Sequence, residues 1–155
     1  MPFEYSYRVP YADCTLGNHI YYARYLDLLE KARGEFFRNI GTTFLQWQEK
    51  DTIFPVIECR LQYKAPARYD DVLSIKVWPT AAERVRLNFG YRIMNQGAKL
   101  ILLAETSHIC AGLDDKPKRL PEDLRTLLLP QLLPAGMTVQ DQARVGNICR
   151  TPDNS

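Results

Sequence analysis

The spacing of apolar residues changes along the first third of the chain, from every second residue to every third or fourth. Residues 3–9 alternate apolar with polar side chains, which is the period of a half-buried β-strand. Apolar residues then recur at helical steps on one face, at Tyr22, Tyr25, Leu26, Leu29, Ala32, Phe36 and Ile40. The pattern predicts a long helix over about residues 19–40, with Gly41 as its C-terminal cap.

A short helix and four more strands are predicted after the long helix. Thr42 or Thr43 can cap a helix that continues through Glu49. Period-two alternation or a β-rich run then marks four strand segments, at residues 57–64, 72–78, 85–93 and 100–111. A turn at residues 95–97 joins the last two strands, and Pro121 opens one more short helix.

The order of strand, long helix and four consecutive strands indicates an α+β fold. Consecutive strands joined by turns favour an antiparallel sheet. Since the apolar face of the helix must be buried, we expect the sheet to wrap around this one central helix, in a single domain of residues 1–132. Residues 133–155 contain proline, glycine and a polar end, and we expect a poorly ordered or partner-packed tail. The open edges of the sheet favour pairing with a second copy.

Composition and charge argue against nucleic-acid binding, a membrane span and secretion. The 155 residues include 46% hydrophobic and 25% charged side chains, as in ordinary globular domains, and the net charge of +2 provides no basic field for nucleic acid. No apolar run is long enough to span a bilayer. The segment MPFEYSYRVP has neither the basic start nor the apolar core of a signal peptide, so we expect a cytoplasmic protein.

Cysteine spacing gives no sign of a zinc or redox site. Cys14, Cys59, Cys110 and Cys149 form no C-x-x-C pair, and in a reducing compartment we expect free thiols. Cys59 and Cys110 lie in apolar stretches, so we interpret both as small core residues.

The junction between the first loop and the long helix concentrates reactive side chains. The stretch YADCTLGNHIYYARYLDLLEKAR begins at residue 11 and holds an acid, a thiol, a hydroxyl and one of the two histidines, at Asp13, Cys14, Thr15 and His19. A helix N-terminus offers unpaired N–H groups that can bind a developing negative charge. The junction is therefore the candidate active site.

Motifs at this junction and later in the chain occur in a characteristic order. They are Tyr11-Ala-Asp13, His19-Ile-Tyr-Tyr-Ala-Arg-Tyr25 and Glu30-Lys-Ala-Arg33, followed by residues 63–71, 105–110 and 118–123. In order and spacing they resemble the hotdog-fold acyl-CoA thioesterases of the 4-hydroxybenzoyl-CoA thioesterase type. The resemblance implies hydrolysis of an acyl-CoA at a dimer interface, with no metal and no cofactor beyond the CoA of the substrate. A helix N-terminal N–H would polarise the thioester carbonyl, and a loop carboxylate would attack it or activate water.

Matching the family's catalytic positions to this sequence one by one does not identify the group that attacks the thioester. The family's catalytic aspartate, eight positions before Ala23, falls at Thr15, which carries no charge. Asp13 matches an earlier acid of the family's loop, and the family's loop glycine falls at Asn18. Either Asp13 takes the catalytic role, or Thr15, His19 and bound water replace the carboxylate. A histidine can activate a hydroxyl or water at neutral pH.

The remaining predicted site groups bind the substrate. By position in the resemblance, the N–H that polarises the carbonyl belongs to Tyr22 or Tyr21. Cations near the pocket are expected to contact CoA phosphates. The predicted substrate-binding residues are Asn18, Tyr21, Lys64, Arg68, Arg84 and Arg86. Structural roles are the alternative, with Asp13 or Asn18 as caps and the arginines on a solvated strand face.

Two other polar positions are interpreted as structural. Glu30 and Arg33 lie three residues apart on the long helix, and we expect an ion pair between them. His108 alternates with polar and apolar residues on the last strand, and we expect a hydrogen-bonded core histidine.

Together these patterns favour an acyl-CoA thioesterase that forms a homo-oligomer, either a dimer or a dimer of dimers (a homotetramer). One alternative is a non-catalytic hotdog protein that binds acyl-CoA or acyl carrier protein, because position 15 lacks a carboxylate. Another is a hotdog enoyl-CoA hydratase or dehydratase, in which an acid such as Glu30 faces His19.

Overall fold

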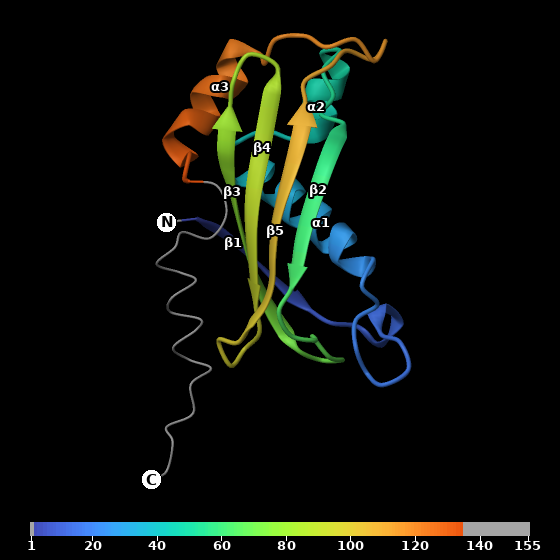
Figure 1. The fold of residues 1–155 in the computed structure, drawn as a ribbon. Coiled ribbons are helices and arrows are strands. Elements are labelled where there is room, and N and C mark those ends of the chain that lie inside the picture. Colours follow the sequence, from blue (N-terminus) through green and yellow to red (C-terminus); the bar gives the residue numbers. More distant parts are fainter. Residues whose placement is uncertain (1, 135–155) are drawn as a thin grey trace.

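The computed structural model describes residues 2–134, in which one long helix packs across an antiparallel sheet (Figure 1). The strands are β1 (Phe3–Arg8), β2 (Val56–Tyr63), β3 (Val72–Ala82), β4 (Arg86–Met94) and β5 (Leu100–Ile109). The helices are α1 (Arg24–Asn39), α2 (Phe44–Glu49) and α3 (Glu122–Leu128), with 3₁₀ turns at Tyr11–Asp13 and Leu129–Gln131. Each strand and helix expected from the sequence is present.

The sheet has the order β1-β3-β4-β5-β2, and all neighbours are antiparallel. β3, β4 and β5 follow one another through hairpins, and the predicted turn between β4 and β5 is closed by the Asn95 N–H, which donates to the Lys99 carbonyl at 3.0 Å. β2 and β3 are not neighbours, so the expectation that turns join all four later strands is wrong. Residues 64–71 instead carry the chain from one edge of the sheet to β3, beside β1.

The long helix ends where the sequence predicts. Gly41 has a φ of 94°, and its N–H donates to the Arg38 carbonyl at 3.0 Å. The Thr42 N–H donates to the Phe37 carbonyl at 3.0 Å, which completes the hydrogen-bond pattern typical of a glycine-capped helix end. Thr43 then begins α2 with a capping box, so the predicted threonine cap is confirmed.

The start of the helix differs from the prediction. α1 begins at Arg24 rather than near residue 19. Ile20 forms a β-bridge with Cys14, and its N–H donates to the Ala67 carbonyl at 2.9 Å. A residue held in extended conformation cannot also have helical dihedral angles, so the helix starts only after the bridge.

One face of α1 is buried against the sheet and forms the centre of the core. Its buried residues are Tyr25, Leu28, Leu29, Ala32, Phe36 and Phe37. The rings of Phe36 and Phe37 meet that of Phe89 on β4, with centroids 5.8 and 6.2 Å apart. Each such buried side chain contributes roughly 1.5–3 kcal/mol. Tyr22 and Leu26, which the spacing assigns to the same face, are 63% and 44% exposed.

β2 is an edge strand whose side chains are exposed on nearly its whole length. Cys110 is fully buried as predicted, but Cys59 on β2 is exposed, so its interpretation as a core residue is wrong. Cys59 lies opposite Thr106 of β5, which is buried. Paired residues on neighbouring strands share a face of the sheet, so Cys59 lies on the core side, at a place that α1 does not cover.

The predicted tail, residues 133–155, lies outside the described residues apart from its first two. The Leu133 N–H donates to the Pro79 carbonyl at 3.1 Å, and Trp78 Nε1–H donates to the Pro134 carbonyl at 3.2 Å. These two residues are therefore attached to β3. Within the described part of the chain, no helix combines the length and the apolar content that crossing a membrane requires.

Replacing Gly90 should destabilise the sheet. Trp78 and Gly90 face each other across β3 and β4, and a Cβ added at Gly90 would lie 2.8 Å from the indole ring. We expect Gly90→Ala to lower the free energy of unfolding by about 1–3 kcal/mol, the usual cost of overpacking. Gly34→Ala is the control, since its Cβ would meet neighbours at 3.9 Å and helix propensity favours alanine by about 1 kcal/mol. Urea denaturation measures both; equal stability of Gly90→Ala and the wild type would contradict this account.

Candidate active site

A tight hairpin precedes α1 and forms the loop of the candidate site. A β-bridge between Cys14 and Ile20 closes the hairpin. Gly17 and Asn18 form its tip with φ angles of 89° and 61°, a left-handed conformation that glycine and asparagine tolerate better than other residues. The adjacent glycine and asparagine therefore explain why the chain reverses here.

The hairpin tip is held against the segment that joins β2 and β3. The Tyr69 N–H donates to Asn18 Oδ1 at 3.0 Å, and Arg68 Nη1 donates to the Gly17 carbonyl at 3.4 Å. The structure thus brings together Asn18 and Arg68, two of the predicted substrate-binding residues. Both make structural hydrogen bonds here, so their role toward a substrate stays a prediction.

The backbone at the start of α1 leaves one predicted donor unpaired. The Tyr21 N–H donates to the Asp13 carbonyl at 2.9 Å, and the Tyr21 carbonyl accepts from the Arg24 N–H at 2.8 Å. The Tyr22 N–H has no acceptor among residues 2–134. Of the two N–H groups predicted to polarise a carbonyl, only that of Tyr22 is therefore available.

The carboxylate of Asp13 is half-buried and held by a residue that sequence reasoning missed. The Tyr7 hydroxyl donates to Asp13 Oδ2 at 2.5 Å, across the 3₁₀ turn that folds the loop back over the end of β1. Burial and the neighbouring carboxylate raise the pKa of Tyr7, so its hydroxyl remains a donor. The signal in the sequence was the alternation of β1, which turns Phe3, Tyr5 and Tyr7 toward the core side.

Thr15 and His19 lie on opposite sides of the hairpin without a side-chain contact between them. The Thr15 hydroxyl donates to the backbone carbonyls of Leu16 and His19, each at 3.3 Å. Both residues are exposed, and in the described part of the chain no hydrogen bond reaches the imidazole of His19. Burial raises the pKa of the Cys14 thiol, which leaves this cysteine poorly suited as a nucleophile.

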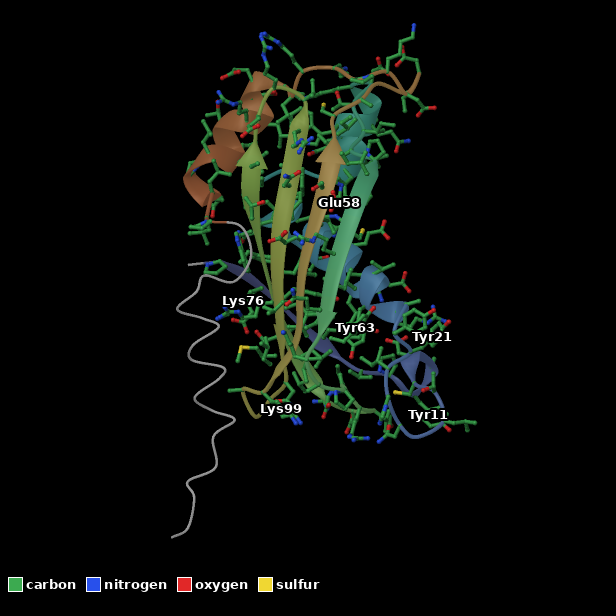
Figure 2. All side chains as sticks on the ribbon, viewed as in Figure 1. Tyr11, Tyr21, Glu58, Tyr63, Lys76 and Lys99 are labelled. Atoms are coloured by element: carbon green, nitrogen blue, oxygen red, sulfur yellow. The ribbon has the colours of Figure 1, made fainter. Side chains whose placement is uncertain are left out.

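Aromatic side chains surround the start of α1. The Tyr63 hydroxyl, at the end of β2, donates to the Tyr22 carbonyl at 2.9 Å. Figure 2 shows Tyr63 beside the helix start, with Tyr21 and Tyr11 at the same end of the molecule. Lys64 follows Tyr63 directly and is exposed. This end of the molecule therefore holds all the predicted catalytic residues and most of the predicted binding residues.

Arg84 and Arg86 lie elsewhere. Arg84 lies in the turn between β3 and β4, and Arg86 is the first residue of β4. Both are therefore near the C-terminal end of β3, whereas Val72 is its first residue. Val72 pairs with Arg8, just before the candidate site. At about 3.3 Å per residue, the length of β3 places the two arginines roughly 30 Å from the hairpin of the same chain.

A second group of polar side chains lies in the core, away from the hairpin, and forms a chain of hydrogen bonds. Arg33 Nη1 donates to the Tyr91 hydroxyl at 3.0 Å, and the Tyr91 and Thr106 hydroxyls lie 2.7 Å apart. Thr106 Oγ1 lies 2.8 Å from His108 Nε2, and His108 Nδ1 lies 3.1 Å from the Phe54 carbonyl. The prediction that His108 is a hydrogen-bonded core residue is therefore confirmed.

The two ends of this chain fix the direction of every bond in it. The Phe54 carbonyl can only accept, so His108 Nδ1 carries the proton and Nε2 accepts from Thr106. Thr106 then accepts from Tyr91, whose oxygen accepts from Arg33. Burial, together with the charge of Arg33, lowers the pKa of His108 to about 4. A neutral His108 satisfies the whole chain, whereas a protonated one would donate from Nε2 to Thr106 and leave one hydroxyl hydrogen of the chain without an acceptor.

Arg33 and Glu30 do not form the expected ion pair. No contact within 4.0 Å joins their charged groups in the described residues, and Arg33 is instead turned inward to Tyr91. Both side chains line a cavity of about 210 Å³ beside α1, whose floor includes His108 and Phe89. The spacing of three residues brings the two side chains close on the helix surface but does not fix their partners. The expectation fails because the buried hydroxyl of Tyr91 is a better-placed partner for Arg33.

These features define a class of protein. A five-stranded antiparallel sheet that packs on one long helix is the hotdog fold. The sequence model of the thioesterase-like superfamily matches residues 9–128. The chain belongs to this superfamily.

Individual relatives agree with the assignment. The acyl-CoA thioester hydrolase YbgC of Escherichia coli is 32% identical over 123 residues, which cover 79% of this chain and 92% of the relative. A crystal structure of a probable thioesterase from Bartonella henselae is 26% identical with a TM-score of 0.73, covering 78% of this chain and all of that one. The 1,4-dihydroxy-2-naphthoyl-CoA thioesterase of Synechocystis, 24% identical, shares the fold with a TM-score of 0.77 over 83% of this chain and 96% of that one.

The described residues contain no group of three or more His, Cys, Asp or Glu side chains placed to hold a metal ion.

Stability should depend on pH through His108. Its pKa is lowered from 6.5 to about 4, so the unfolded state binds more protons than the folded state between these values. The neutral imidazole thus contributes up to about 3 kcal/mol above pH 6.5, which is lost as the pH falls to 4. We expect His108→Gln to flatten the dependence of the free energy of unfolding on pH over this range. His19→Gln is the control for removal of an exposed imidazole, and equal slopes for His108→Gln and the wild type would contradict the buried neutral state.

Proposed function

We propose that this protein hydrolyses the thioester bond of an acyl-CoA, with the carbonyl bound at the start of α1. Water adds to the carbonyl carbon, the C–S bond breaks, and the products are a carboxylic acid and the thiol of CoA. The observation that carries the proposal is the unpaired Tyr22 N–H, next to Tyr21, whose N–H donates to the backbone carbonyl of Asp13. Membership of the thioesterase-like superfamily and the likeness to YbgC support it.

The Tyr22 N–H supplies the electrostatic part of the catalysis. It lies at the positive end of α1 and can donate to the oxygen on which charge develops when the carbonyl is attacked. Because the donor is a backbone group, the absence of a carboxylate at position 15 does not affect it. Tyr63 takes no part in the chemistry itself. Its hydroxyl donates to the Tyr22 carbonyl and so fixes the orientation of this turn.

The attacking group is water activated by Asp13, or Asp13 itself, with Thr15 and His19 assisting. Tyr7 occupies only one oxygen of Asp13, so the other remains to accept a proton from water. The Thr15 hydroxyl is turned to backbone carbonyls, which supports Asp13 over Thr15 as the primary group. His19 is exposed at the hairpin and can reach a substrate that lies over the loop.

CoA is bound by the predicted contacts around the hairpin, and by arginines of a second copy. Asn18, Tyr21, Lys64 and Arg68 lie at the site of one chain, which supports their contact with the same CoA. Arg84 and Arg86 are about 30 Å away in the same chain. If they bind the CoA phosphates, they do so from the partner.

A non-catalytic acyl-CoA or acyl-carrier-protein binder is the second candidate. The observation in its favour is the uncharged Thr15, whose hydroxyl is committed to backbone carbonyls. The hydratase alternative lacks such an observation, because Glu30 lines the cavity beside α1 and no contact joins it to His19 in the described residues.

The site assignment can be tested by single substitutions. We expect Asp13→Asn to lower kcat/KM for acyl-CoA hydrolysis by at least about tenfold, equivalent to roughly 1.4 kcal/mol of barrier. Thr15→Val and His19→Gln should have smaller effects. Asp115→Asn, an exposed acid in a distant turn, is the matched control. If none of the three site variants reaches a tenfold loss across an acyl-CoA panel, the attacking group is wrong; tight binding without turnover in the wild type would favour the non-catalytic candidate.

The proposal includes a homo-oligomer, a dimer or a homotetramer, built on the edge of β2. This strand presents unpaired backbone groups and exposed apolar side chains, including Ile57 at 51% exposure. The neighbouring face of α1 leaves Tyr22 and Leu26 uncovered. A second copy paired at this edge would cover both surfaces. The free thiols of Cys14, Cys59 and Cys110 suit a reducing compartment such as the cytoplasm.

A charge on the β2 edge should break the assembly. We expect Ile57→Lys to convert the oligomer into monomers, because an ammonium group buried in the interface would be desolvated without a partner. Leu129→Lys places the same charge on an exposed apolar position directly after α3, a helix that lies beside β3 and away from β2 (Figure 1), and should leave the assembly intact. Size-exclusion chromatography with light scattering measures both. A monomeric wild type, or an Ile57→Lys variant with unchanged mass, would rule out this interface.

A further inference from the structure

A cavity beside the middle of α1 is separate from the loop and the helix start. It has a volume of about 210 Å³, and its apolar walls include Phe44, Phe54, Leu87 and Phe89. Pockets that enclose a whole drug-sized ligand measure about 300–1,000 Å³. This cavity is therefore large enough for the end of a ligand and too small for all of an acyl-CoA.

Arg33 is the only permanent cation among the described residues that line the cavity. It is half-buried, and no carboxylate of residues 2–134 pairs with it. Its hydrogen bond to the Tyr91 hydroxyl holds the side chain inward but uses one of five guanidinium donors. A partly desolvated guanidinium with free donors is a binding site for a planar anion such as a carboxylate.

Arg33 is the dominant charge of the cavity even though Glu30 also lines it. Glu30 is exposed, so water screens its charge. At the floor, His108 is neutral with both ring nitrogens occupied, and the charge of Arg33 helps to lower its pKa. Glu30 has no corresponding effect on His108. An anion that enters past the apolar walls would therefore meet Arg33 as the nearest uncompensated charge.

An uncovered surface connects this cavity to the helix start. Tyr22, Leu26, Glu30 and Arg33 succeed one another at steps of four and three on one side of α1, and the first two are exposed. Eleven residues, or about 16 Å along the direction of the helix axis, separate Tyr22 from Arg33. Long side chains on a helix lean toward its N-terminus, which brings the guanidinium to about 10 Å from the carbonyl site.

We propose that Arg33 binds a terminal carboxylate on the acyl group, so that the preferred substrates are CoA monothioesters of dicarboxylic acids with about eight to ten carbons. The length follows from about 1.2 Å of reach per bond in an extended chain. Methylene groups lie along the uncovered surface and the apolar walls, and the carboxylate reaches the guanidinium. This proposal rests on the proposed thioesterase function and adds its substrate class.

The test compares acyl-CoA pairs of equal length that differ only at the far end. We expect kcat/KM for suberoyl-CoA to exceed that for octanoyl-CoA by at least about tenfold, and sebacoyl-CoA to exceed decanoyl-CoA likewise. Arg33→Met keeps a side chain of similar reach without charge and should bring both ratios close to one, while Arg33→Lys retains part of the preference. Arg38→Met, which removes an exposed arginine paired with Glu35 on the same helix, should keep the wild-type ratios.

Several outcomes would overturn the carboxylate site. The first is a wild-type ratio of kcat/KM for suberoyl-CoA to octanoyl-CoA of one or below, and the second is an unchanged ratio in Arg33→Met. The third is a stronger preference for 8-hydroxyoctanoyl-CoA, which would indicate that the cavity binds a hydroxyl through Glu30. The wild-type ratio decides the question even if Arg33→Met does not fold. If the wild type hydrolyses no member of the panel, the proposed function fails separately, and calorimetric affinities of suberoyl-CoA and octanoyl-CoA for the wild type still decide whether a terminal carboxylate is bound.

Discussion

The structure depends on one constraint: a single helix must cover a sheet that is wider than itself. Five strands about 4.8 Å apart span roughly 19 Å between the outer strands, whereas a helix with its side chains is about 10–12 Å across. α1 packs on β1 and β3, reaches β4 through Phe36 and Phe37, and leaves β2 largely exposed. The exposed Cys59 and Tyr63, and the exposed Tyr22 and Leu26 on the helix, are consequences of this mismatch. An uncovered apolar surface of this kind serves a partner, a ligand or both.

The same constraint locates the chemistry at one end of α1. The helix must be entered from β1, and the hairpin before it uses the N–H groups of Ile20 and Tyr21 for loop contacts. The Tyr22 N–H is left at the boundary between the uncovered surface and the positive end of the helix dipole. The 3₁₀ turn folds Asp13 back to Tyr7, and the Asp13 backbone carbonyl accepts from the Tyr21 N–H at the same end of the helix.

Sequence periodicity predicts most of the fold because burial and period are directly linked. It fails where a residue's neighbours are set by distant parts of the chain. Ile20 falls within the predicted helix of about residues 19–40, yet its hydrogen bond to the distant Ala67 carbonyl and its bridge to Cys14 hold it extended. Alternation gives the correct face for Cys59 but cannot tell that α1 stops short of it. For the site, the junction was recognisable from Asp13 and the helix start, whereas the hydrogen bonds of Tyr7 and Arg33 depend on tertiary placement.

The two histidines show why burial decides a residue's role more than its type does. His108 lies in a cavity with a cation and a carboxylate, surroundings that suggest catalysis by composition alone. Its Nδ1–H is given to the Phe54 carbonyl and its Nε2 accepts from Thr106, so neither nitrogen is left to take a proton from a substrate. Burial and Arg33 disfavour the imidazolium that a general base must become. His108 is therefore unsuited to act as a general base, and of the two histidines of this chain only His19, in the hairpin, has an exposed side chain.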